Sequence, residues 1–347
     1  MSDVFKMFTG GLWKFVVSWL LPCVVFVAVF LVTLYPPFKR FGFVARLDKS
    51  VTASDALGVV VFAMTAFVIA AVLALNYAPV YRTLEGYTWP RALFLWGRRA
   101  QLKRRNSLAD QINEATANAA TAAENEQPHV AGFHATREAV LRERLSVYPR
   151  YEEDYLPSRL GNAMRAAERY GLDTYDLDTQ AFWYELGTVT PESLQEDMQS
   201  ARGMVDFFVS IVVLAGLYGV AAAGLAFWRL DWRYGIGTAL GLLLSRFAYV
   251  RAANHALEIG KAQRAIVNVS RGKLAEVFGL ALPASIDDER TMWSSLTEFA
   301  NTGDPADAEA LEAWKKPPAG IAGDGRRPTA VPPPEPDAGV GVNRTGG

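Results

Sequence analysis

The chain has 347 residues, of which 51% are hydrophobic, and a formal net charge of −1 at pH 7. A charge this close to zero creates no overall field toward nucleic acid, and the single cysteine, Cys23, excludes an intrachain disulfide. The three histidines, His129, His134 and His255, are too few and too widely spaced for a zinc site. We therefore expect no metal, no cofactor and no nucleic-acid partner.

The first part of the chain, residues 1–75, predicts a transmembrane hairpin. Residues 15–35 and 56–75 contain no charged side chain, and a helix of about 20 apolar residues crosses the ~30 Å hydrocarbon core. A cleaved signal peptide is the alternative for the first run, because Lys6 and Lys14 precede it. That run exceeds the usual ~7–15 residues, however, and Pro36-Pro37 follows where small residues would mark cleavage. We interpret it as an anchor.

Residues 76–105 are rich in aromatic and basic side chains, which predicts an interfacial segment. Pro79 and Pro90 argue against one continuous helix. Rings interleaved with arginines suit a broken segment at headgroup depth, where guanidinium groups meet phosphate. Simple anchoring is the favoured interpretation, and a dedicated lipid-binding site is the alternative.

Residues 106–203 predict a helical domain on the cytoplasmic side. Its clearest helix covers 156–173, with Pro157 in the first turn and Gly171 as the C-terminal cap. One predicted face is apolar and the opposite face is cationic. The apolar face has Leu156, Leu160, Ala163, Met164, Ala167 and Tyr170; the cationic face has Asn162, Arg165 and Arg169, with Arg159 at its edge. A further helix is expected to begin at Thr190-Pro191 and to continue into the third span.

Residues 204–250 predict a second transmembrane hairpin, with spans over 207–227 and 234–250. Gly237 and Gly241 form a GxxxG pair, and Ala215, Gly219 and Ala223 form a matching ridge of small residues. A close hairpin, or a homo-oligomer built on that surface, follows. Arg246 is the one charge within a span and so a candidate functional residue in a pore, gate or ion pair. The competing interpretation is that it extends to lipid phosphate.

The rest of the chain predicts a cytoplasmic helical extension over 251–303 and a disordered tail over 304–347. From residue 317 onward there are seven prolines and seven glycines in 31 residues, too few apolar side chains for a core.

The basic residues that follow the second and fourth spans predict the orientation. Seven lie between residues 82 and 105, whereas Lys39, Arg40, Arg46 and Lys49 in the first loop argue the other way. The larger sum places both termini and the long central loop in the cytoplasm, for a multi-pass protein of the bacterial inner membrane.

A short pattern of residues resembles a known family. It consists of Arg159, Gly161-Asn162, Arg165-Ala166, Glu168 and Tyr170-Gly171-Leu172-Asp173, with Glu85-Gly86-Tyr87 and Pro90. The pattern is similar to that of a family of bacterial four-span membrane proteins with no assigned activity. The likeness covers residues 56–300 loosely, and it departs in the shorter spacing between Glu168 and Tyr170. It implies a topology and no activity.

The sequence contains no P-loop, nucleophile elbow or HExxH motif, so we expect a protein that is not an enzyme. The leading hypothesis is a membrane protein that couples its cytoplasmic helical domain to a protein partner or to self-association. A pore-forming or membrane-perturbing effector in stress or phage defence is the alternative. The candidate interaction surface consists of Arg159, Asn162, Arg165, Glu168, Tyr170 and Asp173. Arginines that merely face solvent or lipid phosphate, or a catalytic cluster, are the other interpretations of these residues.

Overall fold

The computed structural model describes residues 15–40 and 55–316, and this part is all-helical apart from turns and one isolated bridge between Leu280 and Lys315. The predicted all-α class is confirmed. In chain order the elements are η1 (Val16–Leu20), α2 (Leu21–Thr33), η2 (Pro36–Arg40), α4 (Asp55–Leu75), α5 (Tyr77–Glu85), α6 (Arg91–Glu124), α7 (Pro128–Leu145), η3 (Glu152–Asp154), α8 (Arg159–Tyr175), α9 (Trp183–Val189), α10 (Glu192–Arg229), α11 (Trp232–Val277), α12 (Ile286–Thr302) and α13 (Pro305–Glu312). The predictions for Arg46, Lys49 and the tail from residue 317 lie outside the described residues.

By length and composition, three helical segments of the described chain can cross a membrane. They are Val16–Thr33, Ala56–Leu75 and α10. The fourth predicted span, residues 234–250, forms the first part of α11 and is not among them. Membrane insertion is therefore supported by three helices, and the crossing of the fourth stretch stays a prediction.

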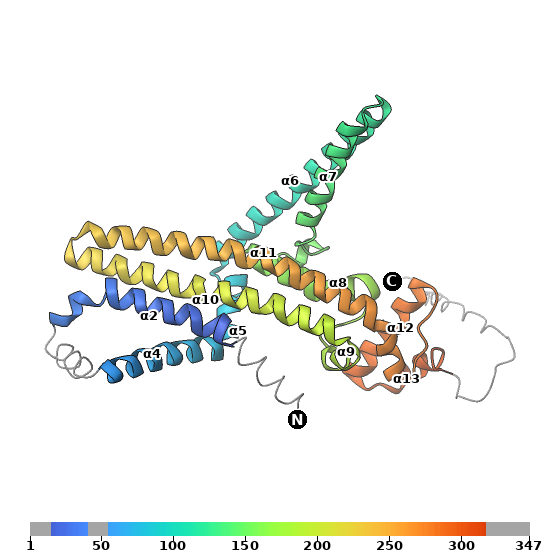
Figure 1. Cartoon of the computed structure of the whole chain (residues 1–347). Coiled ribbons are helices and arrows are strands. Elements are labelled where there is room, and N and C mark those ends of the chain that lie inside the picture. The colour runs from blue at the N-terminus through green and yellow to red at the C-terminus, as the bar shows by residue number, and fades with distance from the viewer. Residues whose placement is uncertain (1–14, 41–54, 317–347) are drawn as a thin grey trace, which may run out of the picture.

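Helices α10 and α11 form an antiparallel hairpin that runs the length of the molecule (Figure 1). At Gly241 a Cβ would lie 2.8 Å from the Gly219 Cα and 2.9 Å from the Ala215 carbonyl oxygen, so the two backbones are in contact. Gly237 faces Ala222, which is buried, whereas the predicted Ala223 is exposed. The predicted ridge is thus wrong at its last position. The contact residue there is Ala222, three residues after Gly219, and not Ala223.

The N-terminal helix, η1 followed by α2, packs on α10. Two hydrogen bonds between serine hydroxyls and backbone carbonyls join the two helices. Pro22 has no N–H to donate to the Ser18 carbonyl, and the helix begins with the π-turn η1 at this point. The Ser18 carbonyl instead accepts a hydrogen bond from Ser210 Oγ at 3.0 Å, and Ser18 Oγ donates to the Gly203 carbonyl at 3.0 Å. Figure 1 shows α2 beside α10, with α4 outermost in this group.

The N-terminal half of α10 and the C-terminal half of α11 pack against α8, α9, α12 and α13, and we call this assembly the helical core (Figure 1). Its largest fully buried side chain is Trp293, whose indole N–H donates to Glu289 at 3.1 Å. Glu289 also pairs with Arg271 at 2.8 Å. The buried carboxylate therefore has both a donor and a compensating charge.

Helices α6 and α7 form a hairpin, which we call the arm, that points away from α11 (Figure 1). A short apolar seam of Ile112, Ala115 and Leu141 holds its two helices together. The predicted boundary at residue 105, between the interfacial segment and the helical domain, is wrong. Helix α6 runs without interruption from Arg91 to Glu124 and contains no proline. The break at Pro90 is confirmed, whereas Pro79 lies in the first turn of α5, where its missing N–H loses no helical bond.

Two predicted helix ends differ from the structure. Helix α8 does not end at Gly171, because it continues to Tyr175 and Asp176 adopts the left-handed conformation at its end, with φ 57°. Thr190 does not cap α10, since its hydroxyl donates to the Leu186 carbonyl and Pro191 occupies the cap position.

The predicted disordered tail begins too early. Residues 304–316 are folded, with Asp304 accepting from Ala306 N at 2.9 Å at the start of α13 and Leu311 buried. Two backbone hydrogen bonds, Ala281 N to Trp314 O at 2.7 Å and Lys316 N to Gly279 O at 2.9 Å, then tie this segment to the end of α11. Leu311 is buried in the helical core, and Trp314 packs against it.

Because Gly241 contacts backbone, we expect Gly241→Ala to lower the free energy of unfolding by about 1–3 kcal/mol through overpacking. Gly235→Ala is the matched control, because a Cβ at Gly235 meets nothing within 4 Å. Thermal unfolding in detergent measures both variants. Equal melting temperatures for the two would contradict the close contact.

Candidate functional site at the α5–α8 junction

Part of the family-like pattern, Glu85, Gly86 and Gly161, comes together where α5 meets the start of α8, and we call this region the junction. Ser158 caps α8 by accepting from Gly161 N at 2.9 Å, and its hydroxyl donates to the Glu85 carbonyl at 2.9 Å. One hydroxyl therefore starts the helix and fastens it to α5. The predicted helix over 156–173, with Pro157 in its first turn, begins too early, because Ser158 is the cap and Arg159 the first helical residue. A serine before an amphipathic run is a common cap, so the sequence contained this signal.

A proline held between two glycines closes the junction. Gly86 ends α5 with φ 101°, and a Cβ there would lie 2.2 Å from the Pro157 ring. On the other side, a Cβ at Gly97 of α6 would lie 2.7 Å from Pro157 Cβ and 2.8 Å from its carbonyl oxygen. Gly161 is equally constrained, because its Cβ would lie 2.4 Å from the Glu85 carbonyl oxygen. The glycines of the pattern thus serve close packing.

Asn162, which the sequence placed on the exposed cationic face, is fully buried. Its Oδ1 accepts from Leu156 N at 2.9 Å, and its Nδ2 donates to the carbonyls of Leu156 at 2.9 Å and Ser158 at 2.8 Å. The amide therefore satisfies the turn that leads into α8. It cannot contact a partner in this structure, which corrects its place on the predicted surface.

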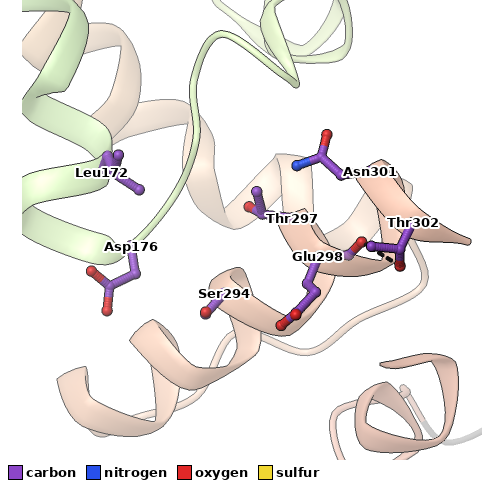
Figure 2. A pocket seen from close by; sticks show the side chains of 7 residues that line it. All are labelled: Leu172, Asp176, Ser294, Thr297, Glu298, Asn301 and Thr302. Atoms are coloured by element: carbon purple, nitrogen blue, oxygen red, sulfur yellow. Dashed lines mark hydrogen bonds between the residues drawn. The ribbon is translucent and has the colours of Figure 1, made fainter. Parts of the chain in front are cut away.

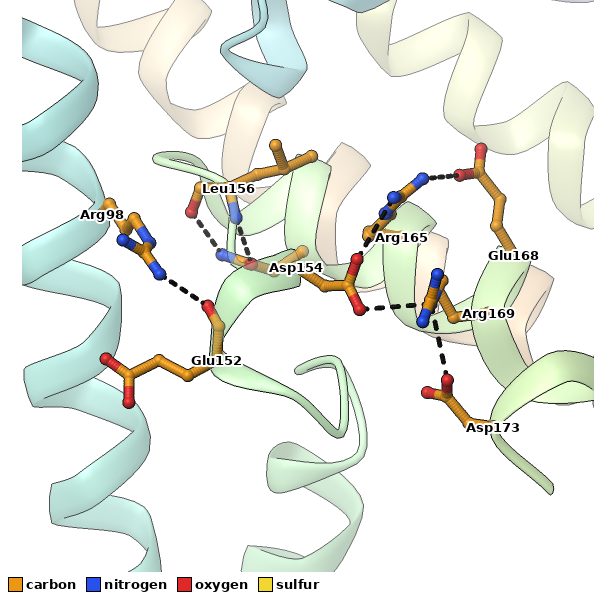
Figure 3. A network of polar contacts seen from close by, with 9 residues as sticks. Arg98, Glu152, Asp154, Leu156, Arg165, Glu168, Arg169 and Asp173 are labelled. Atoms are coloured by element: carbon orange, nitrogen blue, oxygen red, sulfur yellow. Dashed lines mark hydrogen bonds and ion pairs between the residues drawn. The ribbon is translucent and has the colours of Figure 1, made fainter. Parts of the chain in front are cut away.

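The predicted cationic face of α8 is charge-compensated (Figure 3). Arg165 donates to Asp154 at 3.2 Å and pairs with Glu168 at 3.7 Å. Arg169 pairs with Asp154 at 3.1 Å and with Asp173 at 3.4 Å. Two arginines thus contact three carboxylates. One of these, Asp154, belongs to η3, which the chain folds back onto α8, and a helical wheel of α8 alone does not show this contact.

Tyr170 does not lie on an open surface either. Its hydroxyl donates to Asn268 Oδ1 on α11 at 3.1 Å, and Tyr175 donates to the same oxygen at 2.8 Å. The guanidinium of Arg264 lies 5.7 Å from the Tyr170 ring. Tyr170 and Asn268 therefore connect α8 to the part of α11 that belongs to the helical core.

The junction brings two carboxyl groups near one another. Burial raises the pKa of the Glu85 carboxyl to about 7, and the negative charge of Glu168 raises it as well. Burial also raises the pKa of Glu168, against the opposing effect of Arg165. Nearby, Tyr81 of α5 donates to Asp206 Oδ1 of α10 at 2.7 Å. Helix α5 is thus bound to a membrane helix at one end and to α8 at the other.

The last of the predicted site residues, Arg246, lies on α11 and is exposed, with its guanidinium 5.9 Å from the Tyr249 ring. It does not contact the α8 network of Figure 3. The side chain instead lines two cavities together with Arg159, the first residue of α8.

A separate shallow pocket of about 400 Å³ lies between the end of α8 and α12 (Figure 2). Its lining has hydroxyls from Ser294, Thr297 and Thr302, and carboxyls from Asp176 and Glu298. Thr302 Oγ1 donates to the Glu298 carbonyl at 2.9 Å, so this hydroxyl is engaged with the backbone. No histidine or cysteine lines the pocket, and across the described residues no three metal-ligating side chains gather at one point. This lining pairs no nucleophile with a base.

No model of a known protein family, no characterised protein and no solved structure matches the chain. The resemblance to the bacterial four-span family stays a prediction. The class that the structure itself defines is an all-helical membrane protein with a helical core and an arm.

Asn162→Ala would leave the Leu156 N–H and two carbonyls without their partner inside the fold. We expect it to lower the free energy of unfolding by about 3 kcal/mol, because a single unsatisfied buried group costs ~1–3 kcal/mol. Asn118→Ala on the exposed side of the arm serves as control and is expected to change stability by less than ~0.5 kcal/mol. Chemical denaturation in detergent compares the two. A wild-type midpoint for Asn162→Ala would show that the amide network is dispensable.

The raised pKa of Glu85 predicts how stability depends on pH. The folded state holds the proton up to about pH 7, whereas the unfolded carboxyl loses it near 4.5, so stability falls as pH rises between these values. We expect Glu85→Gln to stabilise the protein at pH 8 by on the order of 1–3 kcal/mol and to reduce the pH dependence. Melting temperatures at pH 5 and pH 8 test this. A larger gain at pH 5 than at pH 8 would refute it.

Proposed function

We propose that this chain is a non-enzymatic multi-pass protein of the bacterial inner membrane that couples its cytoplasmic helical core and arm to a protein partner or to a second copy. The observation that carries the proposal is the continuity of two helices. Helix α10 is 38 residues long and α11 is 46, so each extends from the apolar region into the helical core without a break. At ~1.5 Å per residue, both exceed what a membrane requires.

The contacts of α5 support mechanical coupling. The Tyr81–Asp206 bond binds α5 to α10, and the Ser158 bond to the Glu85 carbonyl binds α5 to α8. A displacement of the membrane helices relative to one another would therefore be transmitted to the core through α5 as well as along α10 and α11. Such an element, attached at two points, suits transmission between regions.

The proposal includes four spans with both termini in the cytoplasm. Leu240, Leu242, Leu243, Leu244 and Phe247 are each 50% exposed or more on the first part of α11, which suits contact with lipid. Arg246 lies near the end of this stretch that joins the helical core, where a long side chain reaches headgroup phosphate. The basic residues at the start of the arm support placing that end in the cytoplasm.

The alternative of a pore-forming effector is less well supported, because the polar side chains of the spans are engaged within the chain. Each donates to a backbone carbonyl, at distances between 2.7 and 3.0 Å. They are Ser18, Thr33, Thr65, Ser210, Thr238 and Ser245. A conducting path needs groups free to solvate ions.

Photo-crosslinking in intact cells tests the coupling proposal. A benzophenone amino acid is placed at Phe133 on the arm and at Tyr184 on α9, which are 65% and 86% exposed. We expect a discrete adduct from at least one of these positions, and its mass identifies a partner or a second copy. Leu230, 89% exposed in the turn between α10 and α11, is the control and is expected to give a different adduct or none.

The same cells distinguish the alternative. A voltage-sensitive dye is expected to report an unchanged membrane potential when the full chain is overexpressed. Depolarisation together with no adduct at Phe133 or Tyr184 would overturn the proposal in favour of the effector.

A further inference from the structure

A cationic groove lies where α6 diverges from α11 (Figure 1). It consists of two adjoining cavities of about 960 and 600 Å³ that share Arg104, Arg159 and Arg246 as well as Val250 and Ala253. The arginines come from three different helices, α6, α8 and α11. Volumes of this size hold a small molecule or a headgroup, since ligand sites usually measure ~300–1,000 Å³.

The positive charges of the groove have no carboxylate partners among the described residues. Lys103, Arg104, Arg144, Arg159 and Arg246 all line it, and none occurs in an ion pair there. The single acid in the lining, Glu143, is already paired with Lys261 at 2.6 Å. Like charges held together without an anion repel one another, so an anion that enters the groove relieves this repulsion.

At least two of the arginines act on one point. Burial raises the pKa of the Tyr148 hydroxyl, while the positive charges of Arg159 and Arg104 lower it. Tyr148 lines the larger cavity beside them and donates to Gln101 at 3.3 Å. Because the Tyr148 hydroxyl donates its hydrogen to Gln101, the arginines are the groups of the groove that can bind a phosphate.

The walls of the smaller cavity are apolar and belong to the membrane helices. Val212 of α10 and Leu242 of α11 line it together with Trp89 and Trp96, and Leu242 and Trp96 are 50% and 69% exposed. Ser245 Oγ, which also lines it, donates to the Val212 carbonyl at 2.9 Å, so this hydroxyl is bound to the backbone. Tryptophan at the boundary between apolar and cationic walls is typical of headgroup depth.

We propose that this groove binds an anionic phospholipid, with its phosphate on Arg104, Arg159 and Arg246 and its acyl chains along Val212 and Leu242. A soluble phosphate ester shares the headgroup chemistry, but it would leave the apolar wall next to the cations without a matching partner. The proposal rests on the membrane position of α10 and α11 given under the proposed function. To that function it adds a bound phospholipid, which would hold the arm at a fixed angle to α11.

Native mass spectrometry of the full chain in detergent tests the site with phosphatidylglycerol and phosphatidylcholine as probes. We expect phosphatidylglycerol to bind and to raise the melting temperature more than phosphatidylcholine does. The Arg159→Gln/Arg246→Gln variant is expected to bind phosphatidylglycerol about tenfold or more weakly, since it loses two charge-assisted contacts. Arg246 is exposed and, within the described part of the chain, interacts only with the Tyr249 ring, so its replacement leaves the core intact.

The matched control is Arg99→Gln/Arg137→Gln, which removes the same charge from exposed positions on α6 and α7 outside the groove. It is expected to bind phosphatidylglycerol as the wild type does. Equal weakening in both double variants, or equal binding of the two lipids to the wild type, would overturn the proposal. Displacement of the lipid by millimolar glycerol 3-phosphate would also overturn it and indicate a soluble phosphate ester. These outcomes are independent of the crosslinking result, so failure of one proposal is distinguishable from failure of the other.

Discussion

Close approach of α10 and α11 is the constraint on which the remaining structure depends, because every other element packs on this pair or is attached through it. In the apolar half, Gly219 and Gly241 bring the backbones into contact. In the polar half, the row of small residues along α11 continues with Ala252, Ala256 and Gly260, all of them buried, and at Gly260 the neighbour is Ala167 of α8. Small side chains suit both environments. Water drives the packing in the core, whereas in lipid, close van der Waals contact has to replace the hydrophobic effect.

Because small residues follow one another along α11, short helices can pack closely on it in the polar part of the chain. Helices α8, α9 and α12 need only one apolar face each, since α10 and α11 provide a rigid surface against which it is buried. Two of their buried side chains satisfy polar groups nearby, since Asn162 bonds the turn before α8 and Glu289 accepts from Trp293. The junction follows the same logic, because Pro157 fits between Gly86 and Gly97 only when the backbones have no side chains in the way.

The sequence predicted what depends on local composition and failed where distant segments decide. Uncharged runs of about 20 residues identified the membrane helices, and the apolar stripe of α8, with Leu160, Ala163 and Ala167 buried, followed from its periodicity. The cationic face was mispredicted, because nothing in the spacing of Arg165 and Arg169 shows that Asp154 folds back onto them. The buried state of Asn162 was missed for the same reason. Its partners are in the preceding loop, whose path a helical wheel does not represent.

Of the three α8 arginines, Arg165 and Arg169 are paired with carboxylates, whereas Arg159 has no such partner among the described residues. Arg165 and Arg169 are held by carboxylates of the same region, so the network of Figure 3 needs no external ligand. Arg159 lies six residues before Arg165 and lines the groove, where α6 and α11 contribute further cations in place of acids. Natural proteins rarely gather unpaired cations at a concave surface without a use for the resulting field. The groove is also the place where the arm leaves the membrane helices. In the described residues the base of the arm is held by the packing of Gly97 against Pro157 and by polar contacts, among them Arg98 to the Glu152 carbonyl and Arg264 to the Ser146 carbonyl. An anion bound among Arg104, Arg159 and Arg246 would add a contact that joins α6, α8 and α11 at this place. The orientation of the arm would then depend on the lipid around the protein.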